Sequence, residues 1–166
     1  MKKLLIACLA SLLFVAFLPS HASAQLKRFS IGPYGEVAWP TGDFSNSNST
    51  GLGIGLGADV KLIGGLSVTG SVGYMHFSGK KIDGNKMPAI AAVPVRVGLR
   101  LKFLPIIYVK FESGVANFTG KTDGSAVIIA PGIGLRIIGL DAEVKYEAWA
   151  HDGTLGFWGL KVGYNF

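Results

Sequence analysis

The chain has 166 residues and a formal net charge of +6, with 49% hydrophobic and 16% charged residues. The charged share is below the roughly 25% of an average soluble domain, and the length suggests one domain. A single cysteine excludes a disulfide scaffold, and the many β-branched and aromatic residues exclude a disordered chain. Only one apolar run, at the N-terminus, approaches the length of a membrane-spanning helix, which excludes a polytopic helical membrane protein.

The N-terminal segment has the features of a cleaved secretory signal peptide. Lys2 and Lys3 precede an apolar run, Leu4–Leu18, and Ala22-Ser23-Ala24 supplies the small residues that a signal peptidase reads. We therefore predict residues 1–24 as a signal peptide and residues 25–166 as the mature domain. A retained N-terminal anchor is the alternative, although the apolar run is short for a membrane span.

The charges of the mature domain are scattered and carry no recognisable binding module. It has 14 basic and 10 acidic residues, with no basic run, so we expect no nucleic-acid partner. EF-hand spacing, Cys pairs and His-x-x-x-His motifs are missing from the sequence, so we expect neither a metal site nor a cofactor. Asp43, Asp83, Asp123 and Asp152 fall in loops beside Gly, where turn formation explains them.

Strict alternation of apolar and small or polar residues dominates the mature domain. In Gly51–Leu62 every even position is Leu, Ile, Val or Ala, whereas the odd positions are mainly Gly. This period of two predicts a strand with two different faces. Eight such segments follow one another: Phe29–Trp39, Gly51–Leu62, Leu66–Phe77, Ala91–Phe103, Ile107–Phe118, Ala126–Ile137, Leu140–Ala150 and Leu155–Phe166.

The connections between these segments alternate in length. Longer polar loops occupy Pro40–Thr50, Ser78–Met87, Thr119–Ser125 and His151–Thr154, and tight turns occupy Ile63–Gly65, Leu104-Pro105 and Ile138-Gly139. Long loops at one end and tight turns at the other indicate an up-and-down meander. The expected fold is an all-β, eight-stranded antiparallel up-and-down transmembrane β-barrel.

The polar face of the strands indicates which side is the interior. Its charges alternate with many Gly, Ser, Thr and Ala residues, a mixture that suits a narrow lumen where bulk is matched layer by layer. Mixed signs also allow the pairing that buried charges require. A secreted lipocalin-like binder, with the apolar face inward, is the alternative. The predicted interior charge network comprises fourteen residues: Glu36, Asp59, Lys61, Arg96, Arg100, Lys102, Lys110, Glu112, Arg136, Asp141, Glu143, Lys145, Glu147 and Lys161.

Aromatic residues near the segment ends resemble the two interfacial girdles of a membrane barrel. The segments are also long enough for tilted transmembrane strands, which need roughly 9–11 residues. The predicted girdles are Trp39, Tyr74, Trp149 and Trp158 at the loop end, and Phe29, Phe103, Tyr164 and Phe166 at the turn end.

The last segment resembles the signal by which the barrel assembly machinery recognises outer-membrane clients. Trp158, Leu160, Val162, Tyr164 and Phe166 form its alternating series, which closes on an aromatic residue. The resemblance implies that the machinery is a partner during biogenesis.

The wider chain is similar to the OmpA/OmpX-like superfamily of small outer-membrane barrels. Pro40-Thr41-Gly42-Asp43-Phe44, Gly73-Tyr74 and Gly163-Tyr164-Asn165-Phe166 carry the likeness. It implies a monomer in the outer membrane of a Gram-negative-type bacterium, in contact with lipid and lipopolysaccharide, with both termini in the periplasm. The short loops depart from members with long adhesive loops.

An eight-stranded barrel is just wide enough for side chains to fill it, so we expect a charge-filled, non-conducting lumen. The expected role is structural or surface-interacting, not enzymatic, with a surface partner that the sequence does not identify. A narrow ion channel or porin-like path through the charges is one alternative. Lys80, Lys81 and Lys86 make the second loop basic; they either meet lipopolysaccharide phosphates or are simply solvated.

A second alternative is enzymatic. His76-Phe77-Ser78 resembles the His-x-Ser of outer-membrane lipid A deacylases, with His76 and Ser78 on the lipid-facing side. A serine hydrolase also needs an acid to orient the base, and Asp59 and Glu112 are expected to point inward. The motif also falls earlier in the chain than in that family.

Overall fold

A computed structural model describes residues 28–82, 85–119, 124–151 and 153–166. The predicted signal peptide and its cleavage site lie outside the described residues, as do Asp83, Asp123 and Asp152. No helix in the described part of the chain is long and apolar enough to cross a membrane.

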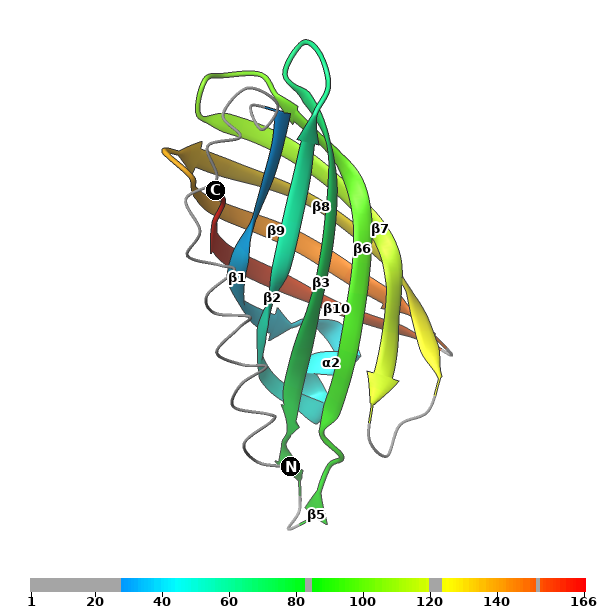
Figure 1. The fold of residues 1–166 in the computed structure, drawn as a ribbon. Helices are drawn as coiled ribbons and strands as arrows, with labels where there is room; N and C mark the ends of the chain where they lie inside the picture. Colours follow the sequence, from blue (N-terminus) through cyan, green and yellow to red (C-terminus); the bar gives the residue numbers. More distant parts are fainter. Residues whose placement is uncertain (1–27, 83–84, 120–123, 152) are drawn as a thin grey trace, which may run out of the picture.

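Eight long antiparallel strands close into one barrel, which confirms the predicted fold class (Figure 1). Each strand pairs with its neighbours in the chain, and β1 closes the barrel against β10, with Trp39 opposite Trp158. The strands are β1 (Phe29–Pro40), β2 (Asn48–Lys61), β3 (Leu66–Gly79), β6 (Ile90–Lys102), β7 (Ile107–Thr119), β8 (Ser125–Ile137), β9 (Leu140–Ala150) and β10 (Thr154–Tyr164).

The loop end of the barrel holds two small elements that were not predicted. The segment expected as a loop after β1 contains the short helix α2 (Gly42–Ser47), which buries Phe44. Beyond β3 the chain forms the hairpin of β4 (Lys81–Ile82) and β5 (Asn85–Lys86), which extends past the barrel at the same end as α2 (Figure 1). The helix forms because Ser45 closes a local bond to the Gly42 carbonyl and because Phe44 gains an apolar environment.

The apolar face of the strands points away from the lumen. Leu52, Ile54 and Val97 are exposed, Ile54 by 70%, and comparable exposed apolar residues occur on all eight strands. A soluble barrel turns such residues inward, whereas a membrane barrel turns them to lipid. The arrangement is therefore opposite to the lipocalin-like alternative.

Seven of the eight residues of the predicted aromatic girdles are exposed, whereas the prediction is wrong for Trp149. Trp149 is 0% exposed and lies inside the barrel. It shares its parity on β9 with Lys145 and Glu147, which are also buried. An aromatic residue at a strand end suggests an interface, but the alternation of the strand decides the face.

This difference predicts which tryptophans sense lipid. A variant that keeps only Trp149 should show little fluorescence quenching in vesicles with brominated acyl chains, since its ring is enclosed by protein. A variant that keeps only Trp39 or Trp158 should be strongly quenched. Equal quenching of all three would contradict the inward position of Trp149.

Candidate functional site: the filled lumen

Most of the fourteen predicted interior charges lie inside the barrel, but they are not equally enclosed. Lys61 is exposed at the turn end, and Lys102, Arg136 and Lys161 are half-buried. The other ten are buried: Glu36, Asp59, Arg96, Arg100, Lys110, Glu112, Asp141, Glu143, Lys145 and Glu147.

One group of ion pairs crosses the loop-side half of the lumen. Arg96 Nη2 lies 2.8 Å from Glu147 Oε1 and 3.8 Å from Glu36 Oε2. Lys145 Nζ lies 2.9 Å from Glu36 Oε1 and 2.6 Å from Glu147 Oε2. The indole of Trp149 also donates to Glu147, at 2.6 Å. Because β1, β6 and β9 are not neighbours in the sheet, these pairs span the lumen.

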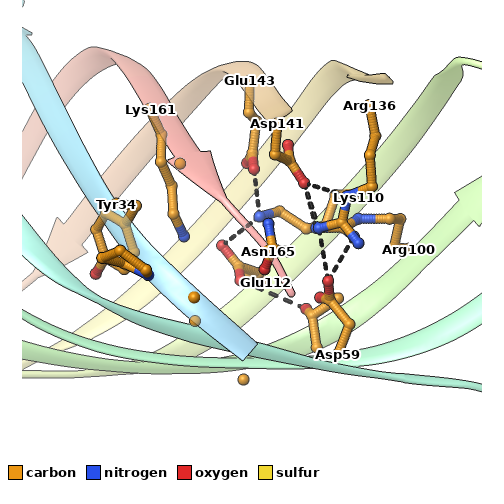
Figure 2. A pocket seen from close by; sticks show the side chains of 16 residues that line it. Tyr34, Asp59, Arg100, Lys110, Glu112, Arg136, Asp141, Glu143, Lys161 and Asn165 are labelled. Carbon is orange, nitrogen blue, oxygen red and sulfur yellow. Dashed lines mark hydrogen bonds and ion pairs between the residues drawn. The ribbon is translucent and has the colours of Figure 1, made fainter. Parts of the chain in front are cut away.

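A second group forms a closed ring near the turn end, between two arginines and two aspartates (Figure 2). Arg100 lies 2.8 Å from Asp59 and 3.2 Å from Asp141. Arg136 pairs with the same two carboxylates, at 2.6 Å for Asp59. The Tyr108 hydroxyl donates to Asp141 and places its ring beneath the Arg100 guanidinium, 4.4 Å from the ring centre.

A third group joins Lys110 to two glutamates, Glu112 at 3.3 Å and Glu143. Thr69 on β3 donates to Glu112 on β7, past the intervening strand β6. Lys161 projects into the same space from β10 (Figure 2), with its ammonium 3.9 Å from the Tyr34 ring centre and no ion pair to any described residue.

Apart from Lys61 and Lys102 at the turn end, the lumen holds six cations and six carboxylates, and such pairing favours keeping buried charges ionised. Every carboxylate forms at least one ion pair, and five of the six cations do so as well. The cations are Arg96, Arg100, Lys110, Arg136, Lys145 and Lys161, and the carboxylates are Glu36, Asp59, Glu112, Asp141, Glu143 and Glu147.

Glycines on the inner face make room for the long side chains. A Cβ atom at Gly55 or Gly73 would lie within 2.6 Å of Tyr34, whose ring crosses that wall of the barrel. A Cβ atom at Gly134 would lie 2.3 Å from the Tyr108 hydroxyl. The predicted matching of small with large inner residues therefore has a direct steric basis.

An aromatic plug fills the loop-side end of the lumen, which sequence reasoning missed. It consists of Phe44, Phe77, Trp149 and Phe157, with ring centres 4.9 to 5.9 Å apart around Phe77. Met75 and Ile128 pack in the same buried cluster. The sequence signal was present, because Phe77 and Phe157 continue the inward parity of β3 and β10.

A small cavity lies within the turn-side half of the lumen. It measures about 30 Å³ and is lined by all four members of the arginine–aspartate ring together with the Lys110 group, Lys161, Tyr34 and Asn165 (Figure 2). That volume holds roughly one water molecule.

The His76–Ser78 pair lies on the outer face of β3, and both residues are exposed. The cross-strand neighbours of His76 are Leu52 and Ala91. Within the described strands, every Asp and Glu faces the lumen, so no carboxylate on these strands stands beside His76 to orient it. No group of residues suited to holding a metal ion occurs in the described part of the chain.

The remaining predicted residues lie at the two ends and on β10. Lys80 donates to the Ser45 carbonyl at 2.6 Å and thereby ties the β3 end to α2, and Lys81 is exposed. The β10 residues of the predicted assembly signal, Trp158, Leu160, Val162 and Tyr164, share its outward parity. Phe166 follows β10, and its backbone N–H donates to Ile31.

No family model and no curated protein matches the chain, but solved structures share its fold. The outer membrane protein Ail of Yersinia pestis, in a phospholipid bilayer nanodisc, aligns with a TM-score of 0.57 at 15% identity, over 81% of this chain and 99% of that chain. A designed transmembrane β-barrel aligns with a TM-score of 0.55 at 17% identity, over 82% and 95%. The N-terminal barrel of Pseudomonas aeruginosa OprF gives 0.54 at 13% identity, over 82% and 97%.

This chain has the fold of the small eight-stranded outer-membrane barrels. The OmpA/OmpX-like architecture predicted from the sequence is therefore confirmed. Identities this low establish the fold and leave the activity open.

The loop-side ion pairs predict a large effect of removing one partner. Arg96→Met should lower the free energy of unfolding by about 3–5 kcal/mol, because Glu36 and Glu147 would then share one buried ammonium. Urea titration in phospholipid vesicles, followed by the gel shift between unboiled and boiled samples, measures the change. Lys81→Met, at an exposed lysine of the loop-end hairpin, is the control and should shift stability by less than about 0.5 kcal/mol. Equal effects would show that the pairs contribute nothing specific.

Proposed function

We propose that this protein is an integral outer-membrane barrel with a structural or surface-interaction role and a lumen that does not conduct ions. In this proposal a signal peptide directs export and the assembly machinery reads the β10 series. The protein is a monomer, with the turn end in the periplasm and the loop end outside. The apolar outer face supports a lipid environment, and α2 with the β4–β5 hairpin gives the loop end a shaped surface for a partner.

The observation that carries the proposal is the continuous filling of the lumen. The aromatic plug closes the loop-side end, and the ion-pair groups occupy the rest. The cavity in the turn-side half is lined by the paired charges themselves, and the aromatic plug lies between it and the loop end. A narrow channel would require several buried ion pairs to separate together, which leaves buried charges without partners.

Planar-bilayer recording tests this proposal. The refolded protein, shown to be inserted by its gel shift, should give no discrete current steps. Steps whose ion selectivity changes in Glu147→Gln would contradict the proposal and favour the narrow-channel alternative, since that carboxylate lies inside the lumen.

The enzymatic alternative has its own test. Neither the protein nor Ser78→Ala should release acyl chains from lipid A in mixed micelles, because the described outer face provides no acid to orient His76. Release by the protein that is lost in Ser78→Ala would overturn the non-enzymatic assignment.

A further inference from the structure

The three tight turns at the turn end are apolar. They comprise Leu62–Gly65, Phe103–Ile106 and Ile138-Gly139, and contain no charged, Asn or Ser residue. Ile63 is 80% exposed and Ile138 is 91% exposed, at the tips of two different turns. Gly and Pro in these turns supply the bends, as in most turns. Their other residues are all large and apolar, which is unusual for an aqueous surface: Leu62, Ile63, Phe103, Leu104, Ile106 and Ile138.

Ile138 adds a backbone argument. Its φ of 47° places a β-branched residue in the left-handed region, where such residues are rare outliers. Nothing in the protein core compensates, because the side chain points away from it. The exposed Ile138 side chain would be stabilised by an environment that removes it from water. Phe103 and Leu140 are also exposed beside the turns, so the apolar outer face of the barrel continues up to the turns.

Uncompensated cations lie at the same end. Lys61 and Lys102 are the last residues of β2 and β6, and neither forms an ion pair with a described residue. Lys102 lies within electrostatic range of Lys61 and Arg136. The nearby carboxylates, Asp59 and Asp141, are each already bound by two arginines.

The turn between β2 and β3 lies beside these cations and contains two residues without side chains, Gly64 and Gly65. Gly64 has open space where a side chain would stand, and Gly65 accepts a backbone bond from Lys102. A phospholipid whose acyl chains lie against the outer wall would have its headgroup beside this turn. Neither Gly64 nor Gly65 has a side chain that would separate the headgroup from Lys61 and Lys102.

We propose that the turn end is immersed in the membrane interface, where Lys61 and Lys102, with Arg136 behind them, bind the phosphate of an anionic phospholipid. This inference rests on the proposed membrane location and deepens it. Phospholipid is favoured over a soluble partner because the apolar turns continue the lipid-facing surface while the adjoining cations match an anionic headgroup. Each such lysine contributes about fivefold in lipid preference, corresponding to ~1 kcal/mol.

Native mass spectrometry of the full barrel, released from vesicles of phosphatidylcholine mixed with phosphatidylglycerol, tests the site. The wild-type barrel should retain phosphatidylglycerol preferentially, and the double variant Lys61→Gln/Lys102→Gln should lose most of that preference. The matched control, Lys80→Gln/Lys81→Gln, removes the same amount of charge at the loop end and should keep the preference for phosphatidylglycerol. Equal losses in both variants, no wild-type preference, or full displacement of the lipid by inorganic phosphate would overturn the proposal.

A second measurement tests immersion of the turns. Ile63→Trp or Ile138→Trp, in a background with the three native tryptophans replaced by Phe, should give blue-shifted emission that brominated lipid quenches. Water-like emission from a barrel that shows the gel shift would overturn this inference while leaving the membrane location intact. Absence of the gel shift would instead refute the proposed function itself.

Discussion

The narrowness of an eight-stranded barrel governs this protein. Side chains from opposite walls meet, so Arg96 on β6 reaches Glu147 on β9 and Glu36 on β1. A charge placed in so confined a space needs a partner within reach, on its own strand or another. Each long aromatic side chain also needs a small residue on the strand beside it, as Tyr34 has Gly55 and Tyr108 has Gly134. The balanced charges, the inner glycines and the bulky plug at one end all follow from this single steric limit.

A filled lumen shifts any activity to the surfaces. The loop end presents α2 and the short hairpin, the wall presents aliphatic residues, and the turn end presents apolar tips around unpaired lysines. Lys80 links the end of β3 to α2, so the loop end is braced rather than loosely attached. Different surfaces at the two ends and on the wall are consistent with a fold that supports unrelated activities.

Much of the architecture could be predicted from periodicity alone. The two-residue period in hydropathy located all eight strands and identified their outward face. It does so because one face of each strand meets lipid and is apolar, whereas the other face meets the lumen and is mixed. Trp149 was misplaced because its residue type was weighed above its parity. Helix α2 was missed because six residues around one buried Phe44 show no helical period. The individual ion pairs could not be predicted from the sequence, because the register between strands decides which cation meets which carboxylate.

The ion pairs also have a consequence for how the strands find their alignment. Leu, Ile and Val on the outside are nearly interchangeable, so sliding β9 by two residues leaves lipid with an equally apolar wall. Inside, the same slide moves Lys145 into the place of Glu147 and sets it against Arg96, where two positive charges repel. The charges in the lumen therefore specify the strand register. A barrel with a shifted strand would be destabilised by repulsion between like charges inside it, although its lipid-facing surface would be unchanged.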